Sequence, residues 1–218
     1  MKITRKRSKI RIIMLSVFVF LLAAAGIAYA LARSDPNPPL AAAEHADGIA
    51  VRMMQAAVTG EPVCLTEEEA GFLLSRSLTR DKRIQGVRLS INDDQTVNVY
   101  VPVLYKQMPL GISAVVAPGL DSASKQITAA VQSVRIGRLP VPPGWFLSQV
   151  KKEAPDRFQV QGNTVRMQSS LLSGLSLSNG NILHLSGLSV SDDGFLVNIT
   201  ADMDTLKNYL ERFLKRAR

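Results

Sequence analysis

The feature that most constrains this chain is an uninterrupted apolar stretch from Ile12 to Ala32. It contains no Asp, Glu, Lys, Arg, His, Asn or Gln. A helix rises about 1.5 Å per residue, so these 21 residues make a helix of about 31 Å, close to the ~30 Å hydrocarbon core of a bilayer. The stretch therefore predicts a transmembrane helix over residues 12–32.

The charges around this stretch predict its orientation. Residues 1–11 form a basic tail of six Lys or Arg residues without an acidic one. Positive residues stay on the cytoplasmic side of a membrane. We therefore expect a single-pass protein of the cell membrane, with a cytoplasmic N-terminus and an extracytoplasmic C-terminal domain.

A cleaved secretory signal peptide is the alternative interpretation of the same stretch. Ala28-Tyr29-Ala30 and Ala30-Leu31-Ala32 both fit the small-residue pattern of a cleavage site, so cleavage would follow Ala30 or Ala32. The apolar run nevertheless reaches a full bilayer crossing, which favours an uncleaved signal-anchor. Both interpretations place the rest of the chain outside the cytoplasm.

The formal net charge of +8 is a consequence of this N-terminus. Seven of the 26 basic residues lie in residues 1–33, so the remainder carries 19 basic residues against 18 acidic ones. A nearly neutral domain offers no face for phosphate backbones, and we expect no nucleic-acid partner. Cys64 is the only cysteine, which excludes an internal disulfide. It leaves an intermolecular bridge or a buried, inert thiol, and the buried thiol is the favoured interpretation.

Beyond the apolar stretch we expect a tether and one folded domain. Residues 33–43 contain Asn37-Pro38-Pro39, which disfavours helix and predicts a short extended, Pro-rich tether. Residues 44–218 predict an α+β domain, built on a twisted antiparallel sheet in one or two layers. Helices are expected near 44–58, 66–79, 143–153 and 204–217.

The helix near residues 66–79 has the clearest start signal. Thr66 followed by Glu69 predicts a capping box. Glu67, Glu68 and Glu69 are consecutive, so they fan around the helix instead of converging on a cation. We expect them to cap the helix and to interact favourably with its dipole.

Strict alternation of apolar and polar residues begins at Gly86 and predicts strands. The expected strands are 87–92, 97–104, 110–116, 125–136, 158–161, 164–169, 172–178, 182–190 and 195–201. Turns are expected at Pro118-Gly119 and Asp192-Asp193-Gly194, and residues 137–144 are expected to break the sheet. Pro102 cannot donate to a ladder, so its strand is expected to end, bulge or have a free edge there.

The chain carries no pattern typical of catalysis or of metal and cofactor binding. His45 and His184 are its only histidines, and His184 is expected on the strand face opposite Leu183 and Leu185. There is no nucleophile elbow, metalloprotease helix, P-loop or dinucleotide-binding loop. We therefore expect a protein that is not an enzyme, with no cofactor and no metal.

What remains is a binding surface. Leucines recur along the C-terminal strands with small polar residues between them, which is typical of a plain sheet over a core, the favoured interpretation, or of a groove wall. Trp145 and Phe146, beside a proline-rich turn, either cover a groove mouth or form a core pair. The expected ligand or partner surface comprises Tyr100, Pro102, Leu139, Trp145, Phe146, Leu175, Leu177, Leu183 and Leu185.

The order of these parts resembles the YpmS family, uncharacterised membrane-anchored proteins of Gram-positive bacteria. The resemblance is carried by the capped helix, by the strand Val99-Tyr100-Val101-Pro102-Val103 and by the run from Val134 to Pro142, which contains G-x-L-P-x-P. It implies single-pass topology and a small extracytoplasmic β-rich domain. The family brings no established catalytic residues, so none is transferred.

Two functions are compatible with these expectations. The first is a membrane-anchored extracytoplasmic module that binds a lipid or another amphiphile in the cell envelope, using the apolar sheet face and the lip from Gly137 to Trp145. The alternative is a scaffold or adaptor without enzymatic activity, which docks another membrane or secreted protein through an exposed edge near Pro102.

Overall fold

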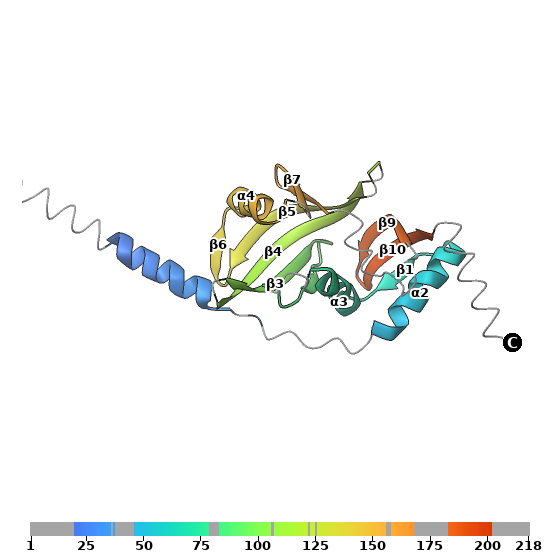
Figure 1. Cartoon of the computed structure of the whole chain (residues 1–218), viewed down its shortest axis with the longest axis horizontal. Coiled ribbons are helices and arrows are strands. Elements are labelled where there is room, and N and C mark those ends of the chain that lie inside the picture. Colours follow the sequence, from blue (N-terminus) through green and yellow to red (C-terminus); the bar gives the residue numbers. More distant parts are fainter. Residues whose placement is uncertain are drawn as a thin grey trace, which may run out of the picture.

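The computed structural model describes residues 20–35, 37, 46–78, 83–105, 107–121, 123–124, 126–155, 158–167 and 183–201. The expected α+β class is confirmed, with mostly antiparallel sheet and a few helices (Figure 1). After a helix over residues 20–33, the elements are α2 (Ala46–Thr59), β1 (Val63–Leu65), α3 (Glu67–Leu78), β2 (Arg88–Ile91), β3 (Val97–Tyr105), β4 (Met108–Asp121), β5 (Gln126–Ile136), β6 (Leu139–Val141), α4 (Pro143–Glu153), β7 (Phe158–Gln161), β8 (Thr164–Met167), β9 (Leu183–Ser191) and β10 (Gly194–Ala201).

Only part of the predicted membrane span lies in the described part of the chain. Residues 20–32 are helical, whereas residues 12–19 are outside the described ranges. No helix among the described residues combines the length and the apolar character that a membrane crossing requires.

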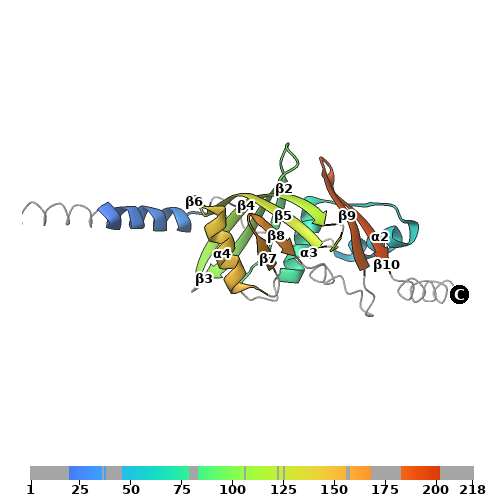
Figure 2. The ribbon, with the colours of Figure 1, turned by 90° about the horizontal axis from the view of Figure 1, so that it is seen from above.

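Two antiparallel sheets form the body of the molecule. The larger is seven-stranded, in the order β2-β3-β4-β5-β8-β7, with β6 paired to β5. The smaller is three-stranded, in the order β1-β10-β9. Figure 2 shows the helix of residues 20–33 entering at one end of the large sheet, with the small sheet and α2 at the other end.

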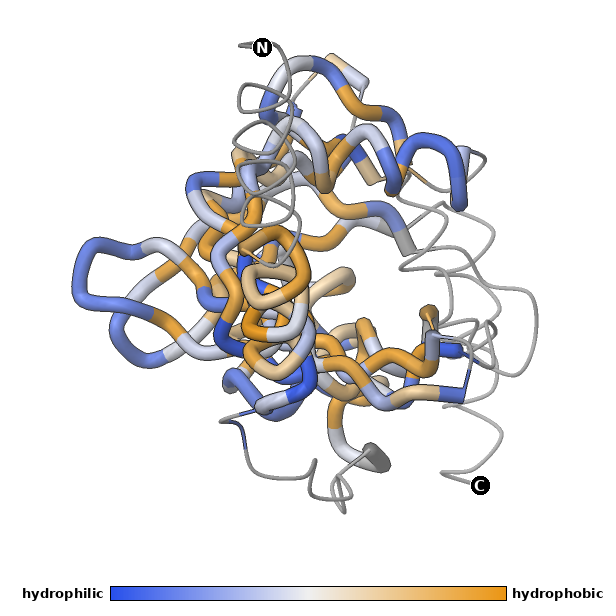
Figure 3. The backbone as a smooth tube through the Cα atoms, turned by 90° about the vertical axis from the view of Figure 1, so that its left-hand side faces the viewer, coloured by the Kyte–Doolittle hydropathy of each residue, from blue (hydrophilic) through white to orange (hydrophobic). Residues whose placement is uncertain are grey.

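One apolar core connects these elements. α2 buries Ile49, Met53 and Ala56, which recur at helical spacing on one face. Val97 and Val134 of the large sheet and Phe195 of the small sheet belong to the same cluster. Figure 3 shows hydrophobic residues along the inner strands and hydrophilic residues at the outer turns. Burial of these side chains supplies the main stabilisation of the fold.

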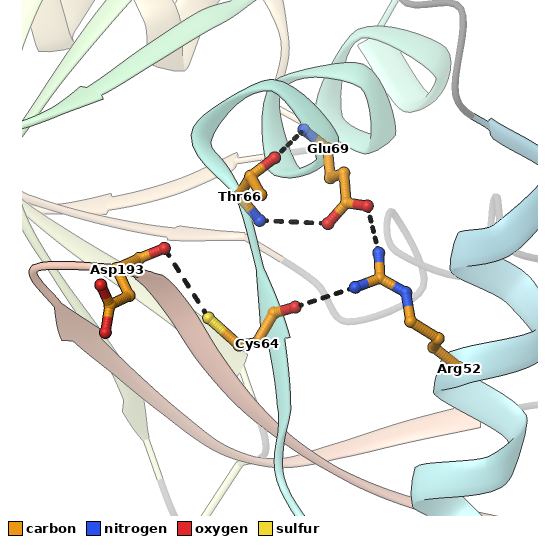
Figure 4. A network of polar contacts seen from close by, with 5 residues as sticks. All are labelled: Arg52, Cys64, Thr66, Glu69 and Asp193. Carbon is orange, nitrogen blue, oxygen red and sulfur yellow. Dashed lines mark hydrogen bonds and ion pairs between the residues drawn. The ribbon is translucent and has the colours of Figure 1, made fainter.

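The predicted capping box is present at the start of α3 (Figure 4). The backbone N–H of Glu69 donates to Thr66 Oγ1 at 3.2 Å, and the N–H of Thr66 donates to Glu69 Oε2 at 3.1 Å. Arg52 of α2 forms an ion pair with the same Glu69 carboxylate and donates to the Cys64 carbonyl. Cys64 itself is half-buried, and its Sγ lies 3.8 Å from the Asp193 carbonyl oxygen.

The largest difference from the sequence expectation is the length of β4. The expected turn at Pro118-Gly119 is wrong, because both residues continue the β4–β5 ladder opposite Ala129 and Thr128. Pairing with β3 ends at Val116, so β4 is an edge strand at Pro118, where a sheet tolerates proline.

The expected break of the sheet at residues 137–144 is also only partly correct. Gly137 and Arg138 form a tight turn, and Leu139–Val141 return as β6 beside β5.

The three-residue strand β1 was not predicted from the sequence. The expected helix at 204–217 and strand at 172–178 lie outside the described residues.

Candidate functional site

The first feature of interest is the junction between the helix of residues 20–33 and the large sheet. The backbone N–H of Arg138 donates to the Leu31 carbonyl at 2.9 Å, and the N–H of Gly137 donates to the Gly111 carbonyl at 2.7 Å. Tyr29 contacts Met108, with 3.6 Å between its hydroxyl and the thioether sulfur. The end of the helix is therefore tied to the β5–β6 turn and to the start of β4.

Gly137 is required at this junction for two separate reasons. Its φ of +57° lies in the left-handed region, which favours glycine. A Cβ at this position would also lie 2.6 Å from the Leu31 carbonyl oxygen and 2.8 Å from that of Ser34. The glycine of the G-x-L-P-x-P run thus serves helix docking.

Two polar side chains continue the junction beyond the helix. The Tyr100 hydroxyl donates to the Asp35 carboxylate, and the Asn37 side-chain amide donates to Ser113 Oγ at 3.5 Å. Burial, together with this hydrogen bond and the negative charge of Asp35, raises the pKa of Tyr100 to about 12. Asp35 and Asn37, in the described part of the expected tether, are therefore hydrogen-bonded to the large sheet.

The second feature is a hollow at the other end of β4. It has a volume of about 450 Å³, within the size range of small-molecule sites. Small residues at Ala117, Gly119 and Ala130 leave this space on the sheet face. The residues that line it are Ala117, Pro118, Gly119, Leu120, Asp121, Thr128, Ala130, Gln161, Thr164 and Arg166.

Arg166 is the cation of this hollow. It lies on β8 opposite Thr128 of β5, and its side chain is half-buried. Its Nε atom is buried and has no hydrogen-bond partner among the described residues. A buried guanidinium donor without an acceptor costs free energy. The charge of the same guanidinium, on a side chain that lines the hollow, would attract an anionic oxygen placed there.

Asp121, at the rim of the hollow, is already engaged by its own turn. Hydrogen bonds from the Ser124 side chain and from the backbone N–H groups of Ala123 and Ser124 lower the pKa of Asp121, with a smaller contribution from the charge of Arg166. Its carboxylate is thus ionised at neutral pH and stabilises the β4–β5 turn.

The residues predicted as a ligand surface do not converge on one place. Tyr100 is buried at the junction, Leu139 is half-buried in β6, and Leu185 belongs to the core. In α4, Phe146 packs on the core, whereas Trp145 is 53% exposed. None of these residues lines the hollow. Leu175 and Leu177 lie outside the described residues, as does the side chain of Leu183.

The expected free edge at Pro102 is covered. The expectation that the strand ends or bulges at Pro102 is wrong as well, because β3 pairs with β4 through Pro102 as far as Tyr105. The β2–β3 ladder ends earlier, at the pair Arg88–Tyr100. Beyond it, the N–H of Gln85 donates to the Pro102 carbonyl at 3.0 Å, and the N–H of Leu104 donates to the Arg83 carbonyl at 2.7 Å. Residues 83–85 therefore occupy the edge on which a docked strand would depend.

The described residues contain no cluster of three or more His, Cys, Asp or Glu side chains with the arrangement of a metal site. His184 is exposed on β9 while its neighbour Leu185 is buried, as the alternation predicted. Neither Arg166 nor the hollow was expected from the sequence. The only available signal was the run of small residues in β4 opposite the small residues of β5.

Comparison with known proteins gives no match: no protein-family model, no curated protein and no solved structure is similar to this chain.

Proposed function

We propose that this chain is a single-pass, membrane-anchored binding module of the cell envelope, and that the hollow around Arg166 binds a lipid or other amphiphile through its anionic group. The apolar stretch of residues 12–32 supports the anchoring, and the basic tail before it supports an extracytoplasmic domain. Membership of the YpmS family is part of the same proposal, and it rests on the order of parts and the G-x-L-P-x-P run.

The observation that carries the binding role is the Arg166 guanidinium in the wall of the hollow, whose buried Nε has no hydrogen-bond partner among the described residues. Proteins rarely leave such a donor without a partner, and functional sites are among the exceptions. Thr128 and Thr164 add hydroxyl groups to the same hollow, while Pro118 and Leu120 add apolar wall. This combination suits a ligand with an anionic head and a short apolar portion.

Ligand binding is tested on the full chain purified from membranes in mild detergent. Native mass spectrometry should detect a co-purifying amphiphile, and a short-chain phosphatidylglycerol should bind in preference to the matching phosphatidylcholine. Arg166→Gln should lose both species, since a neutral amide cannot replace the guanidinium charge.

Asp121→Asn is the matched control for this variant. Asparagine keeps a side-chain acceptor for the turn but removes the negative charge beside Arg166, so binding of the anionic probe should be retained or strengthened. Equal binding by wild type and Arg166→Gln would overturn the proposed site. Topology is tested separately: protease added to intact cells should digest residues 46–201, and their protection would overturn the anchoring.

The adaptor alternative receives less support. Its expected docking edge near Pro102 is covered by residues 83–85. Crosslinking in intact cells would still detect such a partner, and a defined adduct that persists in Arg166→Gln would favour the adaptor over the amphiphile-binding module.

A further inference from the structure

We infer that the end of the domain that bears Tyr105, Arg138 and Trp145 rests on the head-group region of the phospholipid bilayer. The inference rests on the proposed anchoring and adds an orientation of the domain relative to that membrane. We call this end the junction face and define it by these three residues.

Hydrogen bonds place the junction face beside the helix end. Arg138 bonds directly to Leu31, and Tyr29 in the last helical turns contacts Met108 at the tip of the β3–β4 hairpin. Tyr105 closes β3 at that same tip, paired with Met108. Figures 1 and 2 both show α4, which begins two residues before Trp145, at this end of the sheet.

The exposed aromatic side chains gather at this end. Tyr29, Tyr105 and Trp145 are each 53% exposed. α4 buries Leu147 and packs Phe146 on the core, so Trp145 is directed outward by its own helix. Tyrosine and tryptophan are enriched at membrane–water interfaces, because a ring with a polar group suits the boundary between head groups and acyl chains.

Charge at the junction face agrees with a lipid surface. Arg33 and Arg138 are both exposed beside the helix end. Asp35, two residues beyond Arg33, is engaged by the Tyr100 hydroxyl. Exposed arginines at this level attract anionic head groups. The β3–β4 hairpin and the β5–β6 turn are bonded to the end of the helix. If that end lies at the bilayer surface, both therefore lie at the same depth.

The inference has a direct spectroscopic test, because Trp145 is the only tryptophan of the chain. The full chain is reconstituted into liposomes of phosphatidylcholine and phosphatidylglycerol, with and without lipid brominated near the head-group end of its acyl chains. Bromine quenches tryptophan only at close contact. We expect roughly half of the Trp145 emission to be lost in brominated liposomes, since interfacial side chains lie ~5–10 Å deep.

Two double variants separate orientation from mere proximity to liposomes. Trp145→Phe with Tyr105→Trp moves the reporter to the hairpin tip and should be quenched similarly. Trp145→Phe with Val51→Trp moves it to an exposed position of α2, at the opposite end of the molecule, and should keep its emission.

Each failure has its own signature. If the protein stays in alkali-washed liposomes and Trp145 emission is unchanged by bromine, the orientation is wrong and the anchoring stands. Quenching of the Val51→Trp reporter as strongly as Trp145 also overturns the orientation. If the wash releases the protein, the anchoring and the orientation fall together.

Discussion

The Tyr100 hydroxyl and the Asp35 carboxylate form a hydrogen bond across 65 residues of sequence, and this bond joins the segment after the first helix to β3 of the large sheet. Tyr100 is 5% exposed, and the Arg88 guanidinium lies over its ring at 5.6 Å from the centroid. The pair therefore reports, in solution, whether helix and sheet are joined.

The first prediction concerns the ionisation of Tyr100. Its pKa is raised from 10.0 to about 12, so below pH 10 the folded and unfolded states both carry the neutral phenol. As pH rises from 10 to about 12, the unfolded state releases the proton first, and the free energy of unfolding falls. Difference absorbance between wild type and Tyr100→Phe should show a phenolate signal that appears only near the upper end of this range.

Asp35→Asn is the informative companion variant. It removes the negative charge next to Tyr100 but leaves the phenol buried, so the pKa of Tyr100 should fall part of the way towards its ordinary value. A wild-type difference spectrum that already titrates at pH 10, or one unaffected by Asp35→Asn, would mean that the two side chains are apart.

The second prediction concerns Gly137. Gly137→Ala forces a Cβ against the carbonyls of Leu31 and Ser34 and costs about 1–2 kcal/mol for the left-handed backbone alone. We expect a lower Tm and faster proteolysis after residue 33, because the helix end separates from the sheet.

Gly162 provides the matched control for this substitution. Its φ of +59° is nearly that of Gly137, yet a Cβ there has no heavy atom within 4 Å. Gly162→Ala thus carries the backbone cost without the overlap. The difference in Tm between the two variants measures the cost of the overlap between the new Cβ at residue 137 and the carbonyls of the helix end. Equal Tm values would contradict the docking role of Gly137.

A third prediction separates the two tasks of Glu69. Thr66→Ala removes the helix cap and should lower the free energy of unfolding by about 1 kcal/mol. Glu69→Gln keeps an acceptor for the Thr66 N–H but loses the ion pair with Arg52, whose side chain is 44% exposed. Glu69→Gln should lower the free energy of unfolding by less than ~1 kcal/mol, and this loss should shrink as salt is added. Urea unfolding at two salt concentrations measures both.

The fourth prediction fills the hollow. Ala130 is exposed in β5 and lines the hollow, so Ala130→Leu should occupy its space without straining the core. Binding of short-chain phosphatidylglycerol should fall by about tenfold, which corresponds to 1.4 kcal/mol, while the Tm stays within a few degrees. Ser90→Leu places the same side chain on the exposed face of β2, and retained binding there excludes a general effect of added hydrophobicity.

The sequence alone predicted the structure correctly where the interactions that determine it are local. The capping box at Thr66 and Glu69 spans a single helical turn, and the alternation in β2 and β3 specifies a hairpin without distant partners. α4 begins at the expected proline, because the first helical turn does not need its N–H.

Long-range packing explains what the sequence did not reveal. Pro118-Gly119 has turn chemistry, but pairing with β5 on one side and the absence of β3 on the other keep it extended. The glycine of G-x-L-P-x-P pointed to a break in the sheet, whereas its role depends on carbonyls of residues 31–34 that no local pattern brings near. In the sequence, Arg166 is only one arginine in a short strand. Its place in the hollow depends on the fold, which sets it beside small residues of β5 and β4.

β4 begins at Met108 beside the helix end and finishes at Asp121 on the rim of the hollow. Its 14 residues, at about 3.3 Å each, span roughly 45 Å. With the helix seated in a bilayer as proposed, the length of this strand fixes the distance between the lipid head groups and Arg166. Removing matched residue pairs from β4 and β5 would shorten that distance in steps.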